Sequence, residues 1–435
     1  MELLSLVLAL PAVVKIATVF ILILILYRLK VPLSFSILLN AVLLGMWTDG
    51  HVLKSLSWQV HIVLGAESIM LALAIVLLLL FTESLNKSGR MTRTIDALKT
   101  VFRNPRLLYG GLPALVGLLP MPGGAIFSAP MVDALDGKKK VDAALKTAIN
   151  YWFRHIWEYW WPLYPGVILA MKYSGLPIAV YIGIQFPLTI CAVLGGTFFI
   201  LKNIHRSTSS GMALKPGMWS ALLPIGMLVG IAVGGSYLLP LFSVNGTSAS
   251  LLAMLAGLVI SLTFVFAAAP SSFLPSLAIF KKATIWEFVV LVIGIQAFSA
   301  ALKRPLDAHD MTLVGLMRDD FLRLGIPLIA VMIAVPFVSG MVTGVAMGFV
   351  GASFPLVFAL LGPHPAFNEI AGLTTLAYAS GYLGMILSPI HICFVVTNAY
   401  FKSRMLDAYR YILAPAAIVA AGAILFSASY YFLFK

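Results

Sequence analysis

Two stretches of the sequence read P-M-P-G-G-A-I-F-S-A-P-M-V, over residues 120–132, and V-A-M-G-F-V-G-A-S-F-P-L-V, over residues 345–357. Each lies in a longer apolar segment, about 107–135 and 324–361, that contains several prolines and glycines. Proline inside a helix removes a backbone hydrogen bond and clashes with the preceding turn. We therefore expect each segment to form two short helical arms around a non-helical tip, as a re-entrant hairpin and not as a membrane span.

The composition is that of an integral membrane protein. Apolar residues make up 61% of the 435-residue chain and charged residues 10%, whereas a soluble domain carries about 25% charged residues. The excess apolar surface is expected to face the lipid bilayer, and a span needs about 20 apolar residues. Ten stretches are predicted to cross as spans: 9–29, 32–48, 60–82, 149–171, 176–200, 217–241, 248–269, 285–302, 371–400 and 409–434.

The basic residues predict the orientation of the chain. The net charge is +13, and the lysines and arginines fall mainly in the loops between spans. If both proline-rich segments are hairpins, 20 of the 29 basic residues lie on one face of the membrane and 7 on the other. Because cytoplasmic loops carry the excess of positive charge, both termini are expected on the outer side. The same bias explains the net charge without nucleic acid, which we reject as a partner.

The two halves of the chain resemble each other weakly. Aligned without gaps, the quoted stretches share a glycine, a serine, a proline and a valine. In each half, spans precede a hairpin, which is followed by a proline-broken span and a further span. The loop charges give the halves opposite orientations, which is the inverted repeat of many secondary transporters. We expect an all-helical transmembrane fold of two inverted repeats, 1–208 and 209–435, with broken spans at 149–171 and 371–400.

The hairpin tips are candidate binding elements. Broken helices present free backbone groups near the membrane midplane, where inverted-repeat transporters bind their substrates, and hydroxyls with carbonyls would also suit a sodium ion. The structural alternative is that the glycines only permit a tight turn and that each hydroxyl bonds a carbonyl one turn back. The substrate-binding candidates are Gly123, Gly124 and Ser128 in the first hairpin and Ser339, Thr343, Gly344 and Ser353 in the second.

The first broken span carries the most informative group of polar residues. It reads N-Y-W-F-R-H-I-W-E-Y-W-W-P-L-Y-P over residues 150–165. Arg154 and Glu158 are four residues apart and share a helix face, and charges within a span usually face an interior cavity. We expect Arg154 to bind a substrate anion, and Glu158 or the titratable His155 to move a proton. The alternative is a membrane interface with an aromatic belt and a snorkelling arginine.

The matching part of the second broken span is uncharged. Gly381 and Met385 stand at the positions that match the arginine and the glutamate of the first. Its polar candidates are Ser388 for substrate binding, and Ser380 and His391 for proton or ion coupling. Both cysteines of the chain lie within apolar runs and are expected to be small buried side chains, so neither a disulfide nor a metal site is predicted.

The arrangement of hairpins and broken spans resembles that of the ion transporter superfamily. The Pro-Met-Pro-Gly-Gly-Ala hairpin and the Trp-Pro-x-Tyr-Pro span look most like the prokaryotic family known as domain of unknown function 401. This resemblance covers nearly the whole chain. It implies an inner-membrane carrier for anions, commonly carboxylates, driven by sodium or protons through an elevator-type movement. Well-studied relatives carry a Ser-Asn-Thr type signature at the tips, which residues 122–124 and 339–344 lack.

We predict secondary active transport of a small organic anion, by a homodimer because an elevator needs a fixed scaffold, with no cofactor besides sodium. The first alternative is cation/proton antiport with Glu158 as the exchanging carboxylate. The second is a membrane-embedded enzyme acting on lipid. An enzyme is not expected, because no nucleophile, base or metal cluster is evident and the H-E-x-x-H and G-x-S-x-G motifs are absent.

Overall fold

The described part of the chain is helical, which confirms the predicted all-helical fold. The computed structural model describes residues 10–49, 51–90, 104–118, 124–136, 141–204, 218–244, 246–306, 311–362 and 364–434. Within these ranges the regular elements are helices, apart from one isolated bridge between Pro305 and Thr312. Six of the helices are long and apolar enough to cross a membrane, and one bent pair would add a seventh.

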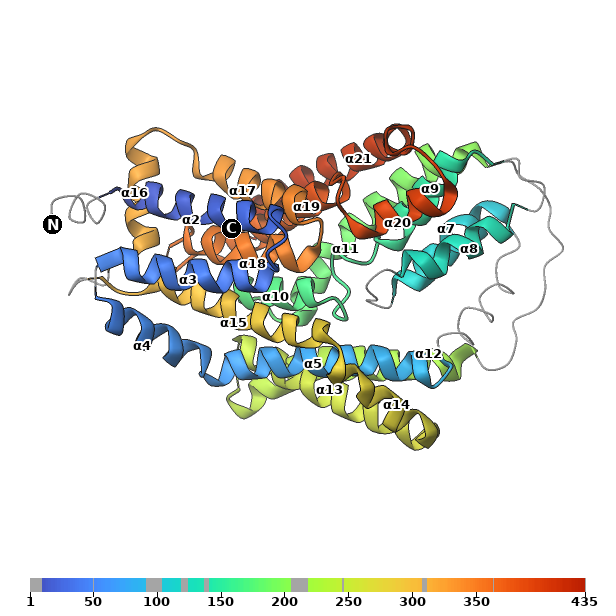
Figure 1. The fold of residues 1–435 in the computed structure, drawn as a ribbon, viewed down its shortest axis with the longest axis horizontal. Helices are drawn as coiled ribbons and strands as arrows, with labels where there is room; N and C mark the ends of the chain where they lie inside the picture. The colour runs from blue at the N-terminus through green and yellow to red at the C-terminus, as the bar shows by residue number, and fades with distance from the viewer. Residues whose placement is uncertain are drawn as a thin grey trace.

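Eight helices form one group. They are α2 (Ala12–Arg28), α3 (Leu33–Asp49), α4 (Val52–Val63), α5 (Ala66–Lys87), α12 (Met218–Leu238), α13 (Gly246–Ala268), α14 (Phe273–Leu277) and α15 (Ala283–Lys303). α3 packs along α15, whereas α5 and α12 pack along α13 in the lower layer of Figure 1. The outer face of α13 leaves Val259 51% and Ile260 45% exposed. Apolar side chains on the outside of such a helix are suited to contact with lipid.

One predicted boundary is wrong in this group. The span expected at 60–82 starts later, because the chain turns at Leu64 and Gly65 between α4 and α5. The long helix therefore runs from Ala66 to Lys87, and α4 is a separate helix of 12 residues. Apolar residues continue across the turn, so hydropathy alone does not show it.

The first hairpin and the first broken span are followed in the chain by one further helix. The elements are α7 (Pro105–Gly117), α8 (Ala125–Ala134), α9 (Ala143–Arg154), α10 (Pro165–Ser174) and α11 (Ile178–Gly195). The Asn104 side chain caps α7 by accepting from the Arg106 amide at 3.0 Å, and Pro105 occupies the first helical position. α7 and α8 pack against each other as the two arms of a hairpin. The tip itself, residues 119–123, lies outside the described residues.

The second half repeats this order of elements. α16 (Leu313–Arg323) leads into α17 (Leu328–Thr343), α18 (Ala346–Ala359), α19 (Phe367–Ile386), α20 (Ile392–Phe401) and α21 (Met405–Leu433). α17 and α18 pack together as hairpin arms, and α19 with α20 forms the broken span. The tip is Gly344 and Val345, where the φ of +63° at Gly344 lies in the left-handed region that favours glycine. The inversion of the two halves across a membrane stays a prediction.

The helices α17 and α19 meet backbone against backbone. A Cβ atom added at Gly340 would overlap the carbonyl oxygen of Gly381, and one added at Gly384 would overlap that of Phe337. Small residues allow such close approach between helices that lipid surrounds, where dispersion and hydrogen bonds replace the hydrophobic driving force. The first arm of the second hairpin and the second broken span therefore form one packed unit.

Replacing Gly384 by alanine should lower the free energy of unfolding by about 1–3 kcal/mol, the usual cost of overpacking, because no space exists for the added methyl group. The thermal midpoint of the purified protein in detergent measures this loss. The matched control is Gly230→Ala in α12, where an added Cβ meets no atom within 4 Å. That control should keep or raise the midpoint, and equal midpoints for the two variants would contradict the packing described.

Candidate functional site

The first broken span opens between Arg154, the last residue of α9, and Pro165, the first residue of α10. Proline has no N–H, so Pro162 and Pro165 cannot continue the ladder of α9. Aromatic side chains of the break donate hydrogen bonds to carbonyls of α7: Trp157 Nε1 to Ala114 at 2.7 Å, Trp161 Nε1 to Leu118 at 2.9 Å, and the Tyr164 hydroxyl to Gly117. These rings hold the break against the first hairpin, which an interfacial aromatic belt would not do.

The second broken span opens between Ile386, which ends α19, and Ile392, which begins α20, with Pro389 inside the gap. The second hairpin tip lies directly against this break. A Cβ atom added at Gly344 would lie 3.1 Å from Cα of His391. Glycine at the tip thus serves both the left-handed turn and the contact with the break.

Tyrosine hydroxyls join the two breaks. From the first broken span, the Tyr151 hydroxyl donates to the carbonyl of Ile386 at 3.0 Å. In the other direction, the Tyr378 hydroxyl donates to the carbonyl of Glu158 at 2.5 Å. The Tyr382 hydroxyl adds a bond to the carbonyl of His155 at 3.0 Å. Each broken span therefore provides the donors that the carbonyls released by the other break require.

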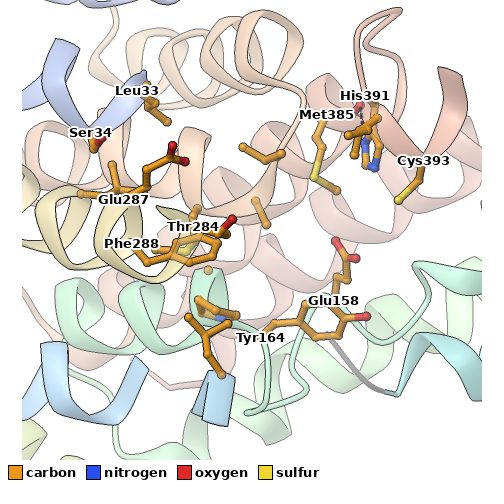
Figure 2. Close-up of a pocket in the computed structure, with 18 of the residues that line it drawn as sticks. Leu33, Ser34, Glu158, Tyr164, Thr284, Glu287, Phe288, Met385, His391 and Cys393 are labelled. Atoms are coloured by element: carbon orange, nitrogen blue, oxygen red, sulfur yellow. Dashed lines mark hydrogen bonds between the residues drawn. The ribbon is translucent and has the colours of Figure 1, made fainter. Parts of the chain in front are cut away.

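A cavity of about 440 Å³ lies where the breaks and the second tip meet. It is lined by four predicted site residues, Arg154, His155, Glu158 and His391. Three helices begin at this cavity, because the first two residues of α10, α18 and α20 all line it. Figure 2 shows Glu158, His391 and Cys393 toward one end of the cavity, and Ser34 and Glu287 toward the other. Residues of both broken spans thus line one cavity, although they lie far apart in the sequence.

Arg154 is 3% exposed at this cavity, and its Nη1 donates to the Cys393 sulfur at 3.2 Å. Gly124, the residue that precedes α8, lies against the same guanidinium, since a Cβ added there would overlap it. The predicted Gly124 therefore sits beside the predicted Arg154, and the absence of a side chain makes room for the arginine head. Gly123, the other predicted tip glycine, lies outside the described residues.

Three of the four hydroxyls predicted in the hairpins bond a carbonyl one turn back. Ser128 donates to Gly124 at 3.4 Å, Thr343 donates to Ser339 at 2.8 Å, and Ser353 donates to Phe349. This is the structural alternative weighed for them. Ser339 differs, because its hydroxyl is fully buried and has no hydrogen-bond partner in the described part of the chain.

The two predicted serines of the second broken span hold the neighbouring hairpin arm. Ser380 donates to the carbonyl of Ile333 at 2.7 Å, and Ser388 donates to the carbonyl of Met341 at 2.7 Å. Both acceptors lie on α17, which contains Pro336. These contacts fix α19 to α17 and do not line the cavity.

The structure adds residues that the sequence analysis missed. Cys393, expected to be a small buried side chain, faces the cavity beside Arg154, and two residues before it lies His391. Glu287, near the start of α15, lines the opposite wall with Ser34. The H-x-C spacing was a weak signal for the first of these. Nothing local marks Glu287, because a glutamate near the start of a span is ordinary.

A solved structure shares this fold. The crystal structure of the Alcanivorax borkumensis YdaH transporter, described as having an unusual topology, superposes with a TM-score of 0.54 at 12% sequence identity. The match covers 87% of this chain and 89% of that one. At this identity the similarity concerns the fold alone. No curated protein sequence matches the chain.

The family assignment rests on nearly the whole length of the sequence. Residues 9–428 match the family model described as "Protein of unknown function (DUF401)". This range includes both hairpins, both broken spans and all the residues that line the cavity. The family expected from the hairpin and broken-span motifs is thereby confirmed, and the chain belongs to the DUF401 family.

Proposed function

We propose that this protein is a secondary active transporter of a small organic anion, such as a carboxylate. The observation that carries the proposal is Arg154, which lies buried at a cavity between two broken helices. A charged side chain inside a span is costly and marks a substrate or ion pathway by default. The fold shared with a transporter at a TM-score of 0.54 supports the same class of function.

The chemistry around the cavity favours an anion. The helices α10, α18 and α20 all point their N-terminal ends at it, and a helix N-terminus offers free N–H groups and a positive dipole end. Arg154 adds a full positive charge in a fork that matches a carboxylate. The tip glycines, Gly124 at the arginine and Gly344 at His391, let the backbone come close to a bound ligand.

The cavity is proposed to open toward the cytoplasm. Tyr27 and Thr284 line the cavity. In the sequence they lie next to or near Arg28 and Lys282, two basic residues of the face assigned to the cytoplasm. On the far side, Lys172 of α10 forms an ion pair with Glu67 of α5, and Thr247 and Ser248 also donate to Glu67, at 3.2 and 3.1 Å. These bonds would close the outer side while the inner side is open.

Alternating access would then be an elevator-type movement. The hairpins and broken spans, joined by the tyrosine bonds and the α17–α19 contact, would shift as one body against the group that contains α3, α5, α13 and α15. Such a fixed scaffold favours a homodimer. The protein is proposed to lie in a prokaryotic inner membrane, with both termini on the outer side. Coupling is proposed to protons or to sodium, with Glu158, His155 and His391 at the cavity as the candidate groups.

A second candidate, cation/proton antiport, is favoured by one observation. Two carboxylates, Glu158 and Glu287, line the same cavity, and a carboxylate can exchange a cation for a proton. In that case sodium or pH would stabilise the protein and no organic anion would do so. An enzymatic activity on lipid is not proposed.

The anion proposal is tested with Arg154→Ala. An anion at 100 times its dissociation constant stabilises the folded protein by about 2.7 kcal/mol, so carboxylates screened against purified wild-type protein should raise its thermal midpoint. Arg154→Ala should abolish the shift because the anion loses its charge partner, whereas Arg154→Lys should retain part of it. The control is Arg410→Ala, because the Arg410 side chain is 59% exposed and forms an ion pair with Asp142 away from the cavity. An anion that stabilises wild type and Arg154→Ala equally would refute this role for Arg154.

The outer closure is tested with Glu67→Gln. Loss of a partly exposed ion pair costs about 0.2–1 kcal/mol, so the outward-open population should rise up to about fivefold. The readout is labelling of Cys393 by a membrane-impermeant thiol reagent added from outside, in a Cys191→Ser background with chelator present. Glu83→Gln is the control, because Glu83 pairs with Lys87 and Lys282 at the other end of α5. Unchanged labelling in Glu67→Gln would contradict the proposed closure.

A further inference from the structure

Three side chains of types that bind metals lie close together in the wall of the cavity. His155 comes from the first break, His391 from the second, and Cys393 from the first turn of α20. One ligand atom from each lies within 4.8 Å of the others, and all three residues are buried. The imidazole ring centroids of His155 and His391 are 4.8 Å apart. The cluster exists only because the two halves of the chain fold together, so the sequence shows only its H-x-C part, His391 and Cys393.

The hydrogen bonds of the two imidazoles prepare them to bind a metal. Nδ1 of His155 lies 2.6 Å from the carbonyl oxygen of Tyr151, and Nδ1 of His391 lies 3.4 Å from that of Met385. A carbonyl oxygen only accepts, so Nδ1 of each ring carries the proton and Nε2 keeps its lone pair. Metal-ligating histidines are held in this way, with the second nitrogen donating to a carbonyl or carboxylate.

Glu158 supplies a fourth donor. Its Oε1 lies 3.8 Å from Nε2 of His155. Zinc bonds to nitrogen at about 2.0 Å and to thiolate at about 2.3 Å, so tetrahedral ligand atoms stand roughly 3.3–3.7 Å apart. The carboxylate of Glu158 and the imidazole of His155 already have nearly this spacing, and the ligand atoms of His155, His391 and Cys393 need to approach one another by about 1 Å. We propose that His155, His391, Cys393 and Glu158 bind one divalent transition-metal ion of the zinc class.

The donor set selects the kind of ion. Imidazole and thiolate favour zinc and similar transition metals, whereas sodium, magnesium and calcium prefer oxygen ligands. The imidazoles and the thiolate therefore select a transition metal over sodium at this position. The metal binds the thiolate of Cys393, and the thiol proton leaves to solvent through the cavity. Because all four donors line a cavity of about 440 Å³, the ion has a path to them.

The neighbouring charges are compatible with the ion. Arg154 donates to the Cys393 sulfur at 3.2 Å, and a thiolate can accept this bond while another lone pair binds metal. Two positive charges on the ion and one on Arg154 face one negative charge on Glu158 and one on Cys393. The remaining single positive charge would attract an anion into the cavity. The metal site goes beyond the proposed transport and does not depend on it.

The test supplies zinc to purified protein that a chelator has first stripped of metal. The zinc that binds is measured by elemental mass spectrometry, with no organic anion present. Wild type should bind one equivalent, and Cys393→Ser and His391→Ala should bind at least tenfold more weakly. The matched controls are Cys191→Ser, at the half-buried cysteine of α11, and His364→Ala, outside the cavity; both should bind as wild type does. Absence of zinc from wild type, or equal binding by Cys393→Ser and Cys191→Ser, overturns the proposal.

A second measurement keeps the test decisive if the cavity variants do not fold. In the Cys191→Ser protein, Cys393 is the single remaining thiol. Zinc should slow its alkylation at least tenfold, and magnesium at the same concentration should not. Alkylation that is insensitive to zinc overturns the metal site. Neither readout involves an anion, so the outcome is separate from that of the Arg154 experiment.

Discussion

In a membrane, a helix can break only where the protein itself satisfies the released backbone groups. Here aromatic side chains meet that requirement. Tyr151 and Tyr378 each cross to a carbonyl in the opposite break, and Trp157 and Trp161 hold the first break on α7. The cavity depends on these bonds, because without them neither break could persist beside lipid and the helix ends that face the cavity would not form.

The buried charges follow from the same arrangement. Arg154 is the last residue of α9, so its guanidinium reaches into the space that the break opens instead of into a packed helix face. Glu158 lies within the break, and His391 lies at the start of α20. Groups that would be costly in a continuous span are thus placed at a cavity where water or a ligand can reach them.

The sequence was sufficient for much of this. Proline and glycine spacing predicted the helix pairs α7–α8 and α17–α18 and the breaks that follow α9 and α19, and the cost of intramembrane charge pointed to Arg154 and Glu158, which line the cavity. It failed where contacts are remote. Glu287 has no local signal, Cys393 has only the weak H-x-C spacing, and hydropathy did not show the turn at Gly65. Ser380 and Ser388 are polar residues near a break, yet they bond α17. Sequence spacing cannot distinguish a hydroxyl that faces a neighbouring carbonyl from one that faces a cavity.

The helix ends at the cavity have a consequence for how this family varies. Much of the proposed recognition comes from main-chain N–H groups of α10, α18 and α20, which every residue except proline provides. Apart from the proposed metal ligands His391 and Cys393, side chains near these ends can change through evolution while the polarity of the site is kept. Family members could therefore diverge widely in sequence and still accept the same class of ligand, with differences in size and shape set by the side chains of the opposite wall.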